Sequence, residues 1–371
     1  MSQLDSPFLF YAAEISYFSG KVRPALRYKR VPYAEVLCTP QAMREVIIAR
    51  TGLAFIPIVV TPENETWQDT SDILDTLEAR FPTPPLFPPT ALQRVTALLW
   101  EIYADEFLVL PAMHYRWSTT EGQTKARGDF AANSGDVESS QKFANRMSGS
   151  LQALGVLPET LAVIEAHTFD LLERLETHFA TTPFLLGDAP SLADCALMGP
   201  FYAHLFLDAV PGRLLRERAP LTCHWIMRMN SPDPAARGRW LEGDSLAPTM
   251  RPLLELIGRD AVPLLLDGLR DFETWADGRP EAHRVSPPRA SGFHRTSLRG
   301  VEFPRYTNAY ALWLATRLFD AMAALDSTAR AQVDAAFAGT GCAALIDYQP
   351  RHRLCKQNFQ LVFENGRTRA A

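Results

Sequence analysis

Three short stretches near the N-terminus decide the fold of this chain: Ser16-Tyr17-Phe18-Ser19-Gly20-Lys21-Val22-Arg23, Ile56-Pro57-Ile58-Val59-Val60 and Asp69-Thr70-Ser71-Asp72-Ile73. The first is a serine-rich turn that leads into a predicted helix. The second is a proline at the start of an apolar, β-branched run, which is typical of a buried strand. The third is an acid and a hydroxyl residue at the start of another helix. Together they predict a small α/β unit that combines a hydroxyl donor, a strand edge and a helix N-terminus.

The segments around these stretches alternate between strand-like and helix-like patterns. Apolar runs predict strands, and apolar residues at helical spacing predict helices. The turn chemistry of 62–65 predicts a hairpin between two of the strands. The order βαβαββα then predicts a small mixed sheet with helices on its faces. The predicted strands are Phe8–Ala12, Tyr33–Leu37, Ile58–Thr61 and Thr66–Gln68, and the predicted helices are Lys21–Lys29, Gln41–Arg50 before Gly52, and a third containing Ile73, Leu77 and Phe81.

Two breaks in composition divide the chain into three predicted domains. The first break, 82–89, holds five prolines and predicts a stiff linker. Helical patterns dominate after it, and the polar segment 118–155 predicts a loop or short helices that cover a site. The second break, 277–300, is rich in Pro, Gly and Ser. We therefore expect an α/β domain at 1–84, an all-helical domain at 90–276 and an α+β extension at 300–371.

The composition of the 371 residues excludes several classes of protein. A hydrophobic content of 47% with 21% charged residues indicates a folded globular protein. The net charge of −5 argues against a general nucleic-acid binder, which would carry a basic surplus. Five scattered cysteines without a CxxC pair, and eight histidines without metal-ligand spacing, predict neither a disulfide framework nor a metal site. The N-terminus lacks the pattern of a signal peptide, and no apolar run is long enough to span a membrane. These features predict a soluble cytoplasmic protein.

The three opening stretches resemble the glutathione S-transferase superfamily, in which a thioredoxin-like domain precedes an all-helical domain. Two further pieces match the family pattern, Val31-Pro32-Tyr33 and Gly187-Asp188-Ala189-Pro190-Ser191-Leu192-Ala193-Asp194. All the pieces follow one another in family order across roughly the first 230 residues. The resemblance implies an α/β thioredoxin-like domain followed by an all-α C-terminal-like domain. The extension would make this an atypically long member.

The resemblance implies that Ser16 is the catalytic hydroxyl. A thiol with a pKa of about 8.5 is mostly protonated at neutral pH, so its use as a nucleophile requires stabilisation of the thiolate. A hydroxyl donor at a helix N-terminus provides that stabilisation. Serine-using members of the family place the hydroxyl where Ser16 stands, sixteen residues before Pro32. Ser19, Tyr17 and Tyr11 remain alternatives, and Ser19 is also a candidate N-cap of the first helix.

The resemblance also assigns glutathione binding to Ile56, Pro57, Asp69 and Thr70. In the family the peptide bond before this proline is cis, so the main chain of Ile56 would pair with the cysteinyl part of glutathione. The helix that follows Asp69 would offer its N-terminus to the γ-glutamyl carboxylate, and Asp69 would accept from the ammonium group. The alternatives are an ordinary trans proline at Pro57 and plain N-capping by Asp69 and Thr70.

Three positions depart from the family pattern. Ala54-Phe55 stands where members often carry a lysine or another polar residue that reaches the glycyl carboxylate. Glu14 places a carboxylate near the expected thiolate, which would disfavour it. Pro24 falls within the first predicted helix, where it would remove one hydrogen bond of the ladder. The first two departures concern affinity for glutathione, and the third concerns the helix.

The resemblance implies a homodimeric enzyme that uses glutathione as co-substrate, needs no metal and joins the glutathione thiolate to a hydrophobic electrophile. We expect that electrophile near Tyr103, Phe107 and the segment 118–155. One alternative is a catalytically silent module of the same fold that serves in interaction or sensing. The other is a glutathione-dependent isomerase or ether-cleaving enzyme. Neither nucleic acid nor a membrane span is expected.

Overall fold

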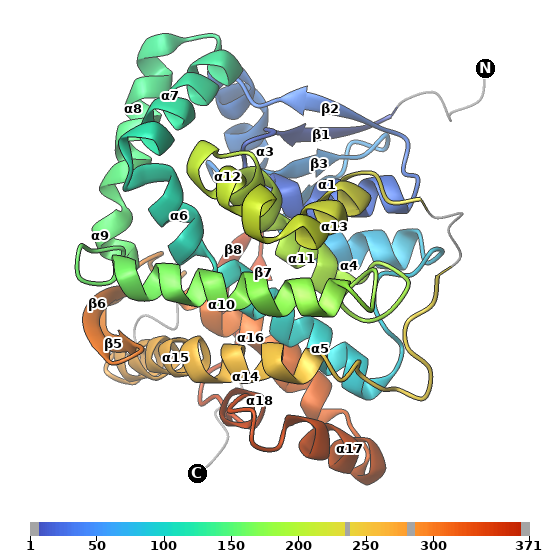
Figure 1. Cartoon of the computed structure of the whole chain (residues 1–371). Coiled ribbons are helices and arrows are strands. Elements are labelled where there is room, and N and C mark those ends of the chain that lie inside the picture. Colours follow the sequence, from blue (N-terminus) through green and yellow to red (C-terminus); the bar gives the residue numbers. More distant parts are fainter. Residues whose placement is uncertain (1–6, 234–237, 280–285, 365–371) are drawn as a thin grey trace, which may run out of the picture.

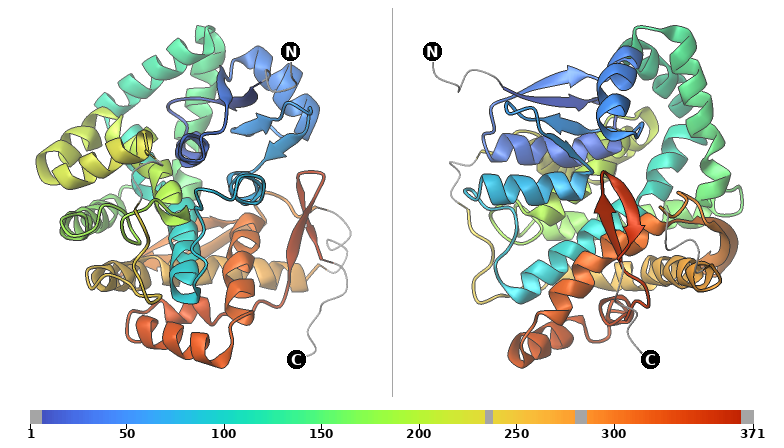
Figure 2. Two further views of the ribbon diagram at one scale, coloured as in Figure 1. Left: turned by 90° about the vertical axis from the view of Figure 1, so that its right-hand side faces the viewer. Right: turned by 180° about the vertical axis from the view of Figure 1, so that it is seen from behind.

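The computed structural model describes residues 7–233, 238–279 and 286–364. A small sheet with its helices forms one end of the molecule, and a larger helical body forms the rest (Figure 1). The last elements of the chain return along this body, and their final hairpin reaches the sheet end (Figure 2). Within the described ranges, no helix is long and apolar enough to cross a membrane.

The N-terminal sheet has the predicted four strands in the order β2-β1-β3-β4. Strand β1 (Phe8–Ala12) pairs in parallel with β2 (Tyr33–Leu37) and antiparallel with β3 (Ile58–Val60). Strand β4 (Thr66–Gln68) completes the sheet by antiparallel pairing with β3. The apolar run of β3 is buried throughout, as expected for a strand with neighbours on both sides. The mixed α/β sheet predicted from the sequence is therefore confirmed.

The helices around this sheet differ from the prediction in detail. Helix α1 (Tyr17–Tyr28) begins four residues before the predicted start, because Ser16 caps it, and it continues past Pro24. The second predicted helix is divided into α2 (Pro40–Ala42), the π-helical η1 (Met43–Ile48) and α3 (Ala49–Thr51). It ends at Gly52, whose φ of +69° suits glycine. The third predicted helix is α4 (Thr70–Arg80).

The predicted all-helical region is confirmed from α5 to α15. The sequence predicted a loop or short helices for segment 118–155. The structure instead has two long helices and one short helix there. Buried Asp194 and Ser191 form the capping box of α11, and Asp194 also accepts from the main-chain N–H of Leu185. The elements are α5 (Ala91–Ile102), η2 (Tyr103–Phe107), α6 (Val109–Trp117), α7 (Thr120–Ser134), α8 (Val137–Gly149), α9 (Leu151–Leu154), α10 (Leu161–Phe179), α11 (Leu192–Pro200), η3 (Phe201–Phe206), α12 (Ala209–Arg218), α13 (Pro220–Asn230), α14 (Met250–Asp260) and α15 (Val262–Asp277).

Residues 286–364, the last range that the structure describes, contain two hairpins and three helices. Its first hairpin, β5 (Gly292–Leu298) with β6 (Val301–Thr307), was not predicted. The inward positions of β5 include His294 and Thr296, which bond to Thr307 and Asp267, so polar residues concealed the alternation of a strand. The remaining elements are α16 (Ala309–Ala323), α17 (Ser327–Phe337), α18 (Ala343–Ile346), β7 (Leu354–Gln357) and β8 (Gln360–Phe363). From here on, the extension means residues 286–364, which begin before the predicted boundary at 300.

Candidate functional site

The three opening stretches meet at one edge of the N-terminal sheet. Tyr11, near the end of β1, pairs with Ile58 at the start of β3, and Ile58 pairs with Gln68 at the end of β4. The loop to Ser16, the Ile56-Pro57 bond and the turn at Asp69 therefore leave the sheet side by side. Strands β1 and β4 end at this edge and β3 begins there, and in α/β proteins ligands bind beyond the carboxyl ends of strands. This edge is the candidate site.

Ser16 is the N-cap of α1 and is partly exposed. Its Oγ accepts a hydrogen bond from the main-chain N–H of Ser19 at 3.3 Å. Its main-chain N–H donates to the carbonyl of Ala13, which fixes the turn. Within the described ranges, no residue accepts from the Ser16 hydroxyl. The hydroxyl proton is therefore available to a ligand atom.

The alternative hydroxyls on α1, those of Tyr17 and Ser19, are buried. Tyr17 is buried, and its hydroxyl donates to the carbonyl of Ala104 at 2.5 Å. Burial, with Asp105 and Glu106 nearby, raises the pKa of Tyr17 well above its usual value. Ser19 is fully buried, and its Oγ accepts from the main-chain N–H of Ala13. Ser16, not Ser19, is thus the N-cap of α1, and Tyr11 on β1 is the remaining half-buried alternative.

Glu14, the acidic neighbour noted in the sequence, is engaged away from Ser16. Its carboxylate accepts a hydrogen bond from the hydroxyl of Tyr202 and lies 3.4 Å from Arg23 Nη2. Arg23 also pairs with Glu35 at 2.6 Å, so one buried guanidinium serves two carboxylates. The negative charge of Glu14 is therefore compensated within the chain.

The Ile56-Pro57 peptide bond is cis. Phe55, just before it, is more than one-third exposed, and the guanidinium of Arg289 lies 4.5 Å from its ring centroid. Arg44 on η1, which could substitute for the absent lysine, is exposed. The guanidinium beside Phe55 thus comes from the extension, which sequence reasoning did not anticipate.

Asp69 and Thr70 form the start of α4. Asp69 has a φ of +75°, in the left-handed region that non-glycine residues rarely adopt. Its Oδ1 accepts from the main-chain N–H of Ser71 at 2.9 Å, so it is an N-cap. Thr70 is buried, and its main-chain N–H and hydroxyl bond to no other residue of the described ranges. Strained backbone and free donors at a helix N-terminus are features of a ligand site.

Two residues of the extension also bind Asp69. The hydroxyl of Tyr310 on α16 donates to Asp69 Oδ1 at 3.2 Å. The ammonium of Lys356 on β7 lies 3.1 Å from Asp69 Oδ2 and 2.8 Å from Asp72 Oδ2. Both carboxylate oxygens of Asp69 are therefore engaged by the chain itself. Sequence reasoning missed these partners because they lie more than 240 residues away.

Comparison with known families identifies the chain. The N-terminal domain of glutathione S-transferases matches residues 10–85, and their C-terminal domain matches residues 161–233. The chain belongs to the glutathione S-transferase superfamily. The suspected resemblance is thereby confirmed. No curated protein sequence matches the chain.

Solved structures with a similar fold include three bacterial proteins. One is a glutathione S-transferase from Methylobacterium radiotolerans in complex with glutathione sulfonate, with 20% identity, coverage of 62% of this chain and 93% of that chain, and a TM-score of 0.40. The second is a beta-etherase from Sphingobium sp. strain SYK-6, with 18% identity, 62% and 97% coverage, and a TM-score of 0.45. The third, from Methylobacillus flagellatus with glutathione bound, has 19% identity, 62% and 97% coverage, and a TM-score of 0.40. Similarities this distant say nothing about the substrate of this transferase-family chain.

In this superfamily member, a buried ion cluster holds the start of the helix that presents Asp69 and Thr70. The ammonium of Lys21 on α1 lies 2.8 Å from Glu101 and 2.5 Å from Asp105, and it donates to Ser71 Oγ at 3.2 Å. All four side chains are buried. Burial raises the pKa of Asp105 to about 7, although the nearby Lys21 opposes the shift. The cluster ties α1 and α5 to the first turn of α4, which presents Asp69 and Thr70.

The expected acceptor residues are not at an open surface. Tyr103 and Phe107 are 0% and 1% exposed, so neither side chain borders an open surface, and the position of the electrophile stays a prediction. The hydroxyl of Tyr103 is 2.7 Å from His167 Nε2, and His167 Nδ1 is 2.8 Å from Asp260. Their aromatic spacing on one helix face therefore indicated a core contact instead of a pocket.

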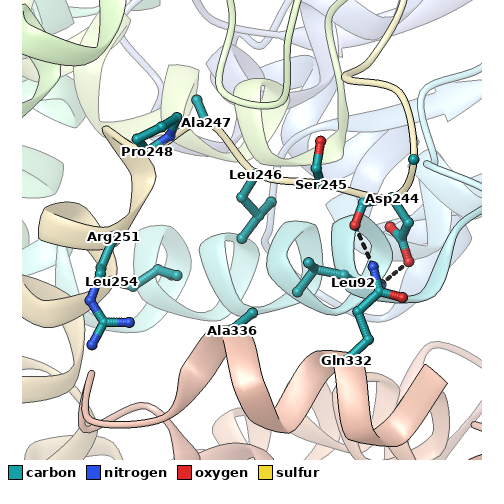
Figure 3. Close-up of a pocket in the computed structure, with 11 residues that line it drawn as sticks. Leu92, Asp244, Ser245, Leu246, Ala247, Pro248, Arg251, Leu254, Gln332 and Ala336 are labelled. Atoms are coloured by element: carbon teal, nitrogen blue, oxygen red, sulfur yellow. Dashed lines mark hydrogen bonds between the residues drawn. The ribbon is translucent and has the colours of Figure 1, made fainter. Parts of the chain in front are cut away.

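A cavity of about 340 Å³ lies far along the chain from the candidate residues (Figure 3). Leu92 of α5, the segment 243–248, α14 and α17 line it, and Gln332 Nε2 donates to the carbonyl of Asp244 at 2.7 Å. None of the predicted site residues borders it. Across the described ranges, no group of three or more His, Cys, Asp or Glu residues could hold a metal ion.

Proposed function

We propose that this chain binds glutathione at the carboxyl edge of its N-terminal sheet and transfers the glutathione thiolate to a hydrophobic electrophile. The observation that carries the proposal is the register of β1, β3 and β4, because it brings Ser16, Ile56-Pro57 and Asp69-Thr70 to one edge. Membership of the superfamily supports a glutathione-using, transferase-type enzyme. Glutathione acts here as co-substrate.

In this proposal Ser16 stabilises the thiolate. Its hydroxyl proton is free to donate to the sulfur, while its Oγ caps α1. A hydrogen bond to the charged form of a group lowers its pKa, and the N-terminus of α1 favours negative charge in the same direction. The main chain of Ile56 would hold the cysteinyl part of glutathione, and the free donors of Thr70 would take the γ-glutamyl carboxylate.

Substitution of Ser16 tests the catalytic assignment. Ser16→Ala removes both the cap and the hydroxyl, whereas Ser16→Asn keeps a good capping group without a hydroxyl. We expect both variants to raise the pKa of the thiol of bound glutathione and to lower kcat/KM roughly 100-fold. Loss of a single catalytic hydrogen-bond donor or proton-transfer group typically has an effect of this size. We expect only Ser16→Ala to lose about 1 kcal/mol of stability. A thiolate absorbance titration that is unchanged in Ser16→Asn would reject Ser16 and leave Tyr11 as the candidate.

The catalytically silent module remains a second candidate, favoured by one observation. The extension engages both oxygens of Asp69 through Tyr310 and Lys356. Titration calorimetry with glutathione separates the two candidates, because a silent module of this kind shows no binding at about 1 mM ligand, which corresponds to roughly −4 kcal/mol. The homodimer and the cytoplasmic location stay predictions, and light scattering checks the first by a mass twice that of one chain.

A further inference from the structure

Lys356 occupies a small cage at the start of α4. Its ammonium lies 3.1 Å from Asp69 Oδ2, 2.8 Å from Asp72 Oδ2 and 3.6 Å from the ring centroid of Trp313. Two carboxylates and an indole face are the surroundings that proteins use to hold a cationic nitrogen. The cage is therefore a complete ammonium site that the chain fills with its own side chain.

The hairpin that carries Lys356 is held firmly at its base. Leu354 and Phe363 are buried there, and the ring of Phe363 stacks on Phe272. Glu273 accepts from the main-chain N–H of Arg351 nearby. Figure 2 shows the hairpin reaching from this base toward the sheet end of the molecule. The position of Lys356 at Asp69 is thus a built feature of the fold.

Asp69 has little capacity left for another ammonium. Its Oδ1 accepts from Ser71 and from Tyr310, and its Oδ2 forms an ion pair with Lys356. A second ammonium at Asp69 would lie about 4 Å from that of Lys356. At this distance near a protein surface, the repulsion between two like charges weakens binding by far more than tenfold. A ligand with a free ammonium at this end is therefore disfavoured while Lys356 is in place.

A carboxylate at the same end meets the opposite situation. The main-chain N–H and hydroxyl of buried Thr70 bond to no other residue of the described ranges, and they lie at the N-terminus of α4. Helix N-termini attract anions, and the two donors of Thr70 would hydrogen-bond a carboxylate there. The two features together favour a carboxylate end without an ammonium.

We propose that Lys356 determines the ligand specificity of this site by taking the place of the ligand ammonium. The preferred ligand class is then a thiol peptide of glutathione shape whose γ-glutamyl end keeps a carboxylate but has no free ammonium. This inference rests on the proposed function, because it assumes that the sheet edge binds a glutathione-like thiol. It makes Lys356 a specificity-determining residue, separate from Ser16.

Calorimetry with two ligands tests the inference on the full chain. The ligands are glutathione and its deaminated analogue glutaryl-cysteinyl-glycine, which differs only in the missing ammonium. We expect the wild type to bind the analogue at least about tenfold more tightly than glutathione, since the repulsion at Asp69 is absent. We expect Lys356→Met to reverse this order, because the cage is then empty and Asp69 and Asp72 can accept the ligand ammonium.

The matched control is Arg353→Met, at the residue just before β7. Arg353 pairs with Asp320 and Glu364, away from Asp69, so its loss should leave the wild-type order of affinities unchanged. If Lys356→Met fails to fold, judged by its thermal transition, Lys356→Gln takes its place. An equal or tighter binding of glutathione by the wild type would overturn the specificity role while the proposed function stands. Absence of binding for both ligands in every variant would instead overturn the proposed function.

Discussion

Two lysines bind the first turn of α4, and they differ in their access to water. Lys21 comes from α1, and the exposed fractions of its side chain and of the two carboxylates that it pairs with are at most 1%. Lys356 comes from β7 and is 14% exposed, while its partners Asp69 and Asp72 are 11% and 42% exposed. The chemistry of the two pairs is alike. The difference in burial makes Lys21 a structural group and leaves Lys356 able to respond to a ligand.

The largest expected effect is the loss of Lys21. Lys21→Met leaves Glu101 and Asp105 buried with one charge partner fewer, and breaking a buried pair in this way costs about 3–5 kcal/mol. Unfolding in urea, followed by circular dichroism, measures the change in free energy. The control Lys142→Met removes an exposed lysine paired with Glu138 and should change stability by less than about 0.5 kcal/mol. A loss below about 1 kcal/mol for Lys21→Met would end the contrast between the two lysines.

The loss of Arg317, the second cation that pairs with Glu101, should give the next largest effect. Arg317 on α16 pairs with buried Glu101 and lies 2.6 Å from Asp75 on α4, and its side chain is 16% exposed. Arg317→Met should lower the free energy of unfolding by about 2–3 kcal/mol, because Lys21 still compensates Glu101 in part. Arg330→Met, which removes the more exposed pairs to Asp334 and Asp347, is the matched control in the extension. Equal losses in the two variants would show that burial of Glu101 adds nothing.

The buried cluster should also make stability depend on pH. Burial raises the pKa of Asp105 to about 7, above its value of about 3.9 in the unfolded chain. The folded state therefore holds the proton more tightly, and the contribution of Asp105 to stability falls as the pH rises from about 4 to about 7. Asp105→Asn cannot ionise, so its stability relative to wild type should increase by more than about 1.4 kcal/mol across this window. Urea unfolding of both proteins at pH 4.5, 5.5, 6.5 and 7.5, illustrative points on this roughly three-unit range, checks the sign. A constant difference would contradict it.

The smallest expected effect is that of Lys356 on stability. Partly exposed ion pairs contribute about 0–1 kcal/mol, so Lys356→Met should lower the free energy of unfolding by less than about 1 kcal/mol. The same urea experiment measures it beside Lys21→Met. A loss comparable to that of Lys21→Met would mean that the β7–β8 hairpin is a structural support. Burial would then not distinguish the roles of Lys21 and Lys356.

Much of the fold could be predicted because local signals agreed with tertiary structure. The strands β1 and β2 have the predicted bounds. The apolar and aromatic run of β1 matches its alternating burial, whereas β2 has no buried residue. The start of α1 was placed too late, because Ser16 and Ser19 are equally good caps in sequence and only the turn held by Ala13 decides between them. The β5–β6 hairpin was not predicted because some of its buried positions hold polar residues. One of them is His294, which forms a hydrogen bond with Thr307 on the other strand.

The candidate site could be predicted only where its residues are close in sequence. Ser16, Ile56-Pro57 and Asp69-Thr70 lie in one α/β unit, so the strand order brings them together. Arg289, Tyr310 and Lys356 come from the extension, and their partners are set by long-range packing that no local pattern encodes. One signal was available: Asp69, Asp72 and Asp75 recur at helical spacing, which places three carboxylates on one face of α4.

The pairing of Lys356 with Asp72 also has a consequence for biosynthesis. The two residues are 284 positions apart, so the ribosome makes the lysine about 15–60 s after the aspartate at roughly 5–20 residues per second. Arg317, the other extension cation that binds α4, is 242 positions from Asp75. During this interval the nascent N-terminal domain exposes an acidic helix face without these partners. Until the last hairpin has left the ribosome, this face lacks the two cations that compensate it in the complete fold.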